Sequence, residues 1–138
     1  MNFNQFVKTL PEGLVYAPIY AKGTRMLSGK PATGKNPLEA SYEQKFGPAD
    51  VALAVKRNPD LKAIGVFTGI RGNGIVILDV DRNLSKYLKA WGSSLDGAPI
   101  ITSTKANAAK YLFRVPEELW ADVKGHGLRK EDGGDYEI

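Results

Sequence analysis

The apolar residues of this chain fall into short runs that are separated by Gly, Pro, Asn and charged residues. Runs rich in β-branched and aromatic residues predict strands, whereas one-sided apolar patterns with flanking caps predict helices. The expected strands cover residues 13–21, 63–69, 74–81, 99–104 and 110–115, and a further strand is expected to begin in the tail "LRKEDGGDYEI". The expected helices cover residues 3–10, 48–57, 83–92 and 116–127. This order of elements predicts an α+β fold with a mainly antiparallel central sheet flanked by helices.

Local signals support three of these elements. Pro48 suits the first turn of a helix, and Pro59 follows the expected end at residue 57. Asn83 is a candidate cap, and Gly92 a stop, for the helix over residues 83–92. Asn73-Gly74 tolerates positive φ angles and predicts a hairpin turn between the strands over 63–69 and 74–81.

With 138 residues, the chain has the size of a single domain, and we expect one hydrophobic core within domain 1–138. No apolar run approaches the roughly 20 residues that cross a bilayer, and the N-terminus lacks the pattern of a secretory signal. The chain has no cysteine, which removes disulfides and thiolate metal sites and fits a reducing cytoplasm. We therefore expect a cytoplasmic protein with no membrane partner.

The net charge of +4 indicates either a polyanionic partner or a solvated basic surface. The distribution of the charge is more informative than its sum. Lys22, Arg25, Lys30 and Lys35 lie in one segment punctuated by Gly and Pro, "AKGTRMLSGKPATGKNP", without an acidic residue between them. This segment predicts a positively charged loop.

The strand over residues 74–81 runs from four apolar residues into Asp79 and Asp81. Its continuous apolar run predicts a central strand covered on both faces. Residues two apart on a strand share a face, so the two carboxylates repel each other unless a positive charge lies nearby. Paired carboxylates suit Mg²⁺ or Mn²⁺, and the chemistry that fits is phosphoryl or nucleotidyl transfer. The plain alternative is a strand end with two exposed acids.

The order of these elements resembles the bifunctional primase-polymerase domain of plasmid, phage and mobile-element replication proteins, in the archaeo-eukaryotic primase superfamily. The resemblance covers nearly the whole chain. It depends on the segment "SGKPATGKNP", on "IGVFTG" followed by "GIVILDVD", on "AAKYLFRVPEELW" about 30 residues later, and on "YEI" at the end. It implies an antiparallel sheet with an RRM-like catalytic core.

The resemblance also implies functional residues. Asp79, Asp81 and Glu137 look like the catalytic and metal-binding acids, and two aspartates alone cannot hold both ions of a two-metal site. Glu137 as an ordinary strand acid remains open. Lys110 takes the position of a family histidine that contacts the phosphates of the nucleotide. Arg114, Lys30 and Lys35 would contact phosphate or template.

Two departures from the family pattern bear on activity. Lys110 retains a positive charge for phosphate but cannot serve as a near-neutral acid or base, and Ala108 replaces a small hydroxyl residue. The family strand with the third acid also continues further. We therefore expect either the N-terminal part of a larger replication protein, truncated at the C-terminal edge of its fold, or a minimal variant.

The leading functional hypothesis is a DNA-templated nucleotidyltransferase, a primase or DNA polymerase, that uses Mg²⁺ or Mn²⁺. Its partners would be single-stranded template DNA, nucleoside triphosphates and a helicase or initiator domain. The first alternative is a catalytically weak or inactive nucleic-acid-binding module of a replication initiator. A third hypothesis is a metal-dependent phosphohydrolase that acts on small nucleotides.

Overall fold

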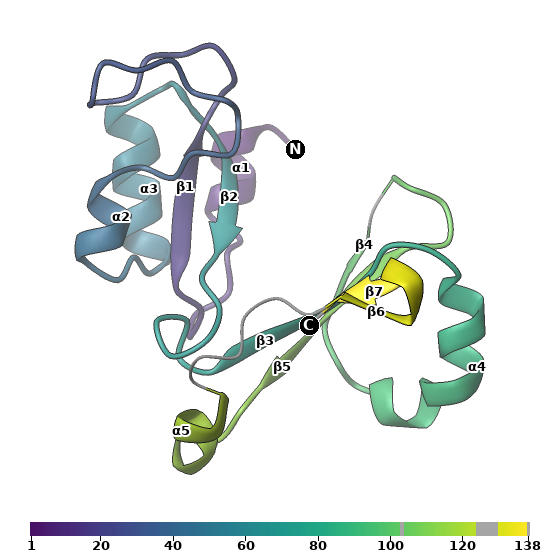
Figure 1. The fold of residues 1–138 in the computed structure, drawn as a ribbon. Helices are drawn as coiled ribbons and strands as arrows, with labels where there is room; N and C mark the ends of the chain where they lie inside the picture. The colour runs from purple at the N-terminus through teal and green to yellow at the C-terminus, as the bar shows by residue number, and fades with distance from the viewer. Residues whose placement is uncertain (103, 124–129, 138) are drawn as a thin grey trace. The chain divides into compact units, whose positions relative to one another are not determined.

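The computed structural model describes residues 1–102, 104–123 and 130–137 (Figure 1). The chain divides into two compact units. The first unit consists of Met1–Phe67 with Arg71–Asn73, and the second of Thr68–Ile70 with Gly74–Ile138. Each unit has its own cluster of buried apolar side chains. The expectation of one core is therefore wrong, and each unit is described by itself.

The first unit contains a two-stranded antiparallel sheet with helices packed against it (Figure 1). Its elements are α1 (Phe3–Val7), β1 (Tyr16–Tyr20), α2 (Ala40–Glu43), α3 (Pro48–Arg57) and β2 (Leu61–Val66). Tyr20 and Leu61, from the two strands, and Val51 from α3 have no accessible surface. Pro18 lies within β1, which the two-stranded sheet leaves as an edge strand, where the missing N–H of proline costs little.

The helix expected over residues 48–57 is confirmed as α3 with the same bounds. Pro48 occupies its first turn, and the Gly47 N–H donates to Asp50 Oδ2 at 2.8 Å. Lys56 and Arg57 lie in the last turn, where positive charge stabilises the carbonyl end of the helix. Local signals at both ends thus determine this helix.

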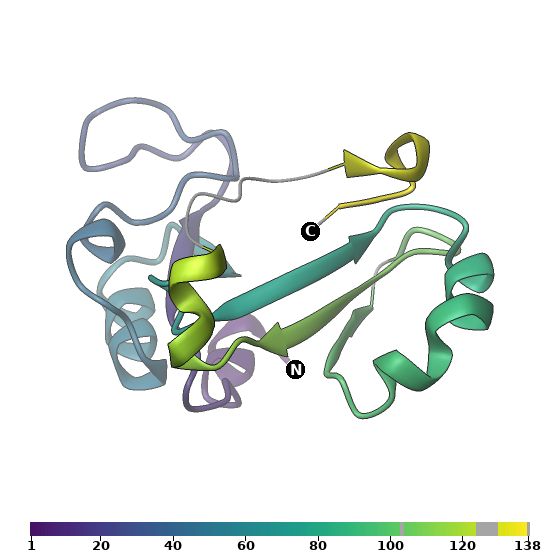
Figure 2. The ribbon, with the colours of Figure 1, turned by 60° about the horizontal axis from the view of Figure 1, so that its bottom comes forward.

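The second unit contains a five-stranded antiparallel sheet with the strand order β4-β5-β3-β7-β6. The strands are β3 (Ile75–Val80), β4 (Ile100–Thr102), β5 (Ala109–Arg114), β6 (Lys130–Glu131) and β7 (Tyr136–Glu137). Figure 2 shows β3 and β5, the two longest strands of this sheet, side by side. The expected α+β class with antiparallel pairing is confirmed, and β3 has the expected central position.

The predicted hairpin between β2 and β3 is wrong. Asn73 and Gly74 adopt the expected positive φ angles, 57° and 83°. However, β2 pairs with β1, whereas β3 pairs with β5 and β7, in a separate sheet. The Gly74 N–H instead donates to the Gly69 carbonyl at 2.8 Å, which closes a wider turn. The turn chemistry was therefore predicted correctly, but the strand partners were not.

The helix expected over residues 83–92 differs from expectation at both ends, and residues 124–127 of the helix expected over 116–127 lie outside the described residues. Helix α4 (Leu84–Leu95) runs three residues past Gly92, and Asn83 precedes it in the left-handed region without a side-chain capping bond. Asn107 caps it instead, because its Oδ1 accepts from the Ser85 N–H at 3.0 Å. After Pro116 the chain forms a short 3-10 helix, η1 (Glu117–Leu119), and then α5 (Trp120–Val123). No helix in the described part of the chain is long and apolar enough to cross a membrane.

Gly74 provides a test of this fold, because a Cβ there would collide with Trp120 Nε1 and the Val115 carbonyl. Those two atoms form a hydrogen bond of 2.8 Å. Gly74→Ala should lower the unfolding free energy of the second unit by about 3 kcal/mol, from backbone strain and overpacking together. The measurement is denaturant unfolding followed by fluorescence, since both tryptophans of the chain, Trp91 and Trp120, lie in this unit.

Gly69 is the matched control. It also has a positive φ angle, 67°, but a Cβ there would meet nothing within 4 Å. Gly69→Ala should therefore cost only the backbone strain, about 1 kcal/mol. Equal losses in the two variants would contradict the close approach of Trp120 to Gly74.

Candidate functional site

The candidate site begins with the alternation of side chains along β3. Leu78 and Val80 are buried in the apolar cluster of the second unit, where they pack with Tyr87 of α4. Because successive strand residues point to opposite faces, Asp79 lies on the other face of the sheet. Its side chain is 20% exposed. The strand thus presents a carboxylate on the face that α4 does not cover.

The register of the sheet brings two distant parts of the chain to Asp79. Lys110 of β5 is opposite Asp79 on one side, and Glu137 of β7 is opposite it on the other. Directly opposed residues of antiparallel strands have Cβ atoms roughly 5 Å apart. Positions 79, 110 and 137 therefore form one row across the sheet. All three were expected from the sequence to be site residues.

Lysines neutralise both aspartates. Lys110 Nζ donates to Asp79 Oδ2 in a close ion pair, and Lys105 Nζ lies 3.6 Å from Asp81 Oδ1. The side chain of Asp81 is 47% exposed, so the second pair lies in solvent and contributes little to stability. The positive charges that the two carboxylates require are thus supplied by the protein itself. Lys105, in the loop between β4 and β5, was not predicted as a site residue.

The donor set is compatible with a divalent cation. Asp79 and Asp81 provide hard carboxylate oxygens, which Mg²⁺ and Mn²⁺ prefer, and both side chains are accessible to solvent. A cation would have to displace the ammonium group of Lys110 from Asp79. Among the side chains that the structure describes, no three acids or histidines form a metal-binding group. For Glu137, the structure describes the backbone pairing with Asp79.

A buried carboxylate, Asp135, holds the chain that follows the two aspartates. Its backbone carbonyl accepts from the Asp81 N–H at 2.9 Å. Its side chain accepts from Asn83 Nδ2 at 3.1 Å, Tyr87 Oη at 2.9 Å and Arg82 Nε at 2.6 Å. Asp135 therefore ties β7 to the end of β3 and fixes the backbone that carries Asp81.

Sequence reasoning missed Asp135 and assigned Asn83 to helix capping. The side chain of Asn83 is instead bound to Asp135, 52 residues away along the chain. The polar run "DRN" directly after the strand was the available signal. Its partner could not be identified without the fold, because nothing local connects Arg82 and Asn83 to the segment after residue 130.

An open depression of about 630 Å³ lies beside Asp81. Its lining residues are Asp81, Arg82, Lys105, Gly133 and Gly134. Arg82 donates to the Gly133 carbonyl, so the glycine turn of η2 (Asp132–Gly134) is held against the end of β3. The depression combines one acid, two cations and a small-residue wall, which suits a polar ligand.

The other predicted site residues are not part of this row across the sheet. Arg114 pairs with Ile75 at the opposite end of β5, four residues and about 13 Å along the strand from Lys110. Lys30 and Lys35 are exposed and belong to the first unit. Lys30 lies in a short hairpin in which the Met26 N–H donates to the Lys30 carbonyl at 3.0 Å. The structure therefore groups Asp79, Asp81, Lys110 and residue 137, but not Arg114.

Comparisons of the chain with protein-family models, with curated proteins and with solved structures find no match.

The Asp135 network predicts a pH-dependent stability. Hydrogen bonds from Asn83 and Tyr87, and then the contact with Arg82, lower the pKa of Asp135 below its usual value of 3.8. A lowered pKa adds stability above about pH 4, and that stability is lost as the pH falls through the folded-state pKa. Asp135→Asn should therefore lower the melting temperature of the second unit at pH 7, and the difference from wild type should shrink towards pH 3. Tryptophan fluorescence melts at several pH values measure this.

Asp122→Asn is the control, because Asp122 is an exposed acid of the same unit in α5. It should melt like the wild type across the range. If the melting temperatures of Asp135→Asn and wild type differed by the same amount at pH 7 and pH 3, this would contradict a stabilising charge at Asp135.

Proposed function

We propose that the second unit contains a metal-dependent nucleotide-binding site and that this site performs DNA-templated nucleotidyl transfer. One observation carries the proposal: the sheet register places Lys110, Asp79 and residue 137 in one row, next to Asp81. These positions are the cation and the three acids that the resemblance to primase-polymerases implies. They come from strands far apart in the sequence, so their grouping does not follow from the sequence motif alone.

In this proposal Asp79 and Asp81, with Glu137, hold Mg²⁺ or Mn²⁺. A bound divalent cation would stabilise the charge that develops on the attacking and leaving oxygens of phosphoryl transfer. The protein contributes the fixed spacing of the carboxylates, which the ladder of β3 and the Asp135 anchor maintain. That rigidity supports a site with defined geometry.

Lys110 has two alternative partners in the proposal. Without a ligand it forms the ion pair with Asp79. With a cation bound to Asp79, its ammonium group is released and can bind a phosphate oxygen of the nucleotide as a point charge. Because the side chain of Lys110 is 42% exposed, this movement requires no unfolding of the sheet.

The first unit supports the nucleic-acid side of the proposal. It contains ten Lys and Arg against five Asp and Glu, whereas the second unit contains nine against ten. The excess positive charge of the chain therefore belongs to the first unit. A unit with net charge +5 attracts a phosphate backbone. The exposed Lys30 and Lys35, in an ordered loop without acids, are its candidate contacts.

The test is template-directed extension of a labelled primer, with nucleoside triphosphates and Mn²⁺. Wild type should incorporate nucleotides, and Asp79→Asn with Asp81→Asn should reduce incorporation at least about 100-fold, as expected when groups that stabilise developing charge are lost. Lys110→His should retain activity, whereas Lys110→Glu should lose it through repulsion of the triphosphate. Mn²⁺ should also raise the melting temperature of wild type but not of the double aspartate variant.

Asp60→Asn with Asp122→Asn is the matched control, since it removes the same charge at exposed positions that are not among the site residues. It should behave as wild type in both measurements. Equal Mn²⁺ stabilisation in both double variants would exclude Asp79 and Asp81 as metal ligands.

A second candidate function is a nucleic-acid-binding module without catalysis. The observation that favours it is the neutralisation of both aspartates by Lys110 and Lys105, which provides a stable site in the absence of metal. Incorporation that is absent in wild type, together with intact DNA binding, would favour this module over the nucleotidyltransferase.

Both functions predict salt-dependent DNA binding by the first unit. In a plot of the logarithm of the association constant for single-stranded DNA against the logarithm of the salt concentration, the points should fall on a line with negative slope. The double variant Lys30→Ala with Lys35→Ala should make this slope shallower by about 1.4, which is roughly 0.7 for each lost phosphate contact. Fluorescence anisotropy with a labelled oligonucleotide measures the slope. Lys8→Ala with Lys62→Ala, which removes two other exposed lysines of the unit, should leave it unchanged. An unaltered slope in the first double variant would place the DNA contact elsewhere.

A further inference from the structure

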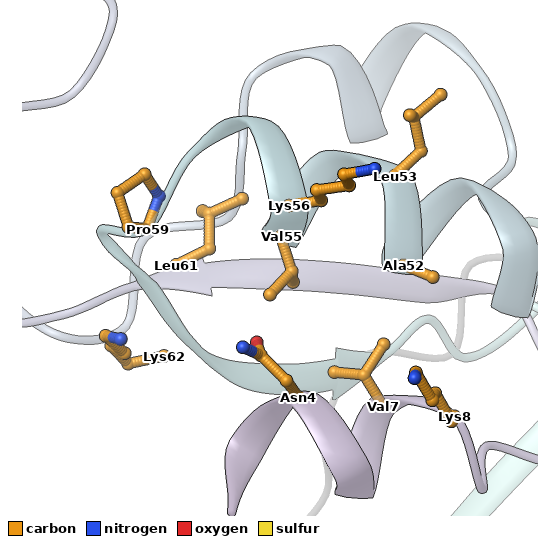
Figure 3. A pocket seen from close by; sticks show the side chains of 10 residues that line it. All are labelled: Asn4, Val7, Lys8, Ala52, Leu53, Val55, Lys56, Pro59, Leu61 and Lys62. Atoms are coloured by element: carbon orange, nitrogen blue, oxygen red, sulfur yellow. The ribbon is translucent and has the colours of Figure 1, made fainter.

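A groove of about 680 Å³ lies in the first unit, and none of the site residues assigned above lines it (Figure 3). Figure 3 shows α1 and α3 on two sides of it, with β2 contributing at one end. Its lining residues are Asn4, Val7, Lys8, Ala52, Leu53, Val55, Lys56, Pro59, Leu61 and Lys62. All of them belong to one compact unit.

The floor of the groove is aliphatic. Val7, Val55 and Leu61 are buried, and they form part of the apolar cluster of the unit. Leu53 of α3 also lines the groove, but its side chain is 47% exposed and points away from Val55 in Figure 3. An exposed leucine beside a buried aliphatic floor leaves apolar area that a ligand can cover.

The charged residues of the groove are all lysines. Lys8 ends α1, Lys56 lies in the last turn of α3, and Lys62 lies on β2, so each comes from a different element. No acidic residue is among the lining residues. Within the described part of the chain, none of these three lysines forms an ion pair. The groove therefore combines an aliphatic floor with uncompensated positive charge around it.

We propose that this groove binds an acidic segment of a partner protein, with an aliphatic side chain on the floor and carboxylates beside the lysines. Three separated cations fit a ligand with several separated negative charges better than an amphiphile with one anionic head. No aromatic residue lines the groove, so it offers no stacking surface for a nucleic-acid base. The groove is also open to solvent, as suits a peptide that enters from the side rather than a small enclosed ligand.

The experiment selects binders from a random dodecapeptide display library against the full chain. Enriched peptides should contain a Leu, Ile or Val flanked by Asp or Glu. The best peptide, synthesised and titrated by fluorescence anisotropy, should bind at least about tenfold more weakly when Lys8, Lys56 and Lys62 are all changed to Gln. Leu53→Gln should also weaken it, and this exposed helical position tolerates Gln without loss of the fold.

Lys22, Lys30 and Lys35 changed together to Gln form the matched control, because the net charge falls equally in the same unit. This control and Asp79→Asn with Asp81→Asn should bind the peptide as wild type does, which separates the groove from the proposed catalytic site. Three results would overturn the proposal: no enrichment, peptide affinities unaffected by the groove substitutions, or a groove-dependent affinity for monomeric dodecyl phosphate that exceeds the affinity for the peptide.

Discussion

The antiparallel pairing of β3 with β5 and β7 is the constraint on which the candidate site depends. A backbone ladder fixes which residues oppose each other, and a slip of one residue would move Asp79 to the buried face and expose Leu78 and Val80. Burying an unpaired carboxylate is costly, so the slipped register is disfavoured. The apolar residues of β3 therefore set its register, and the register in turn sets the charges around Asp79.

Asp79 sits between a cation position and an acid position, and this arrangement has two electrostatic solutions. In the first, Lys110 compensates Asp79 directly, as in the structure. In the second, a divalent cation compensates several carboxylates at once and releases Lys110 for an anionic group. A cation and a phosphate would then bind cooperatively. The cation would replace Lys110 as the partner of Asp79, and the phosphate would replace Asp79 as the partner of Lys110. Lysine serves this exchange better than a neutral histidine would, since it keeps its charge in both states.

The sequence predicted those parts of the fold that depend on local chemistry. Pro48 and the residues after Arg57 determine α3, and the apolar run before Asp79 determines a central strand. Asn73-Gly74 also predicted the turn geometry, but it did not predict the strand that pairs with β3. A turn limits the local direction of the chain, whereas side-chain packing determines which strands pair. Asn83 was assigned as a cap on local grounds, but Asp135 competes for its amide. The hydrogen bond between Asp135 and Tyr87 joins segments that are remote in sequence, and so does the grouping of the groove lysines around Val55. No local sequence pattern predicts either contact.

The two units carry unequal net charge, which matches the different roles proposed for them. A net charge of +4 spread evenly would attract a polyanion weakly everywhere, including at the carboxylates that should hold a cation. The chain instead gathers its positive excess in the first unit and leaves the second nearly neutral. Under the proposed function, long-range attraction of DNA would decrease with salt. A cation held directly by Asp79 and Asp81 would be less sensitive, because short contacts lie well within the screening length of about 8 Å at physiological ionic strength. Salt would therefore distinguish the two proposed binding events in the intact chain.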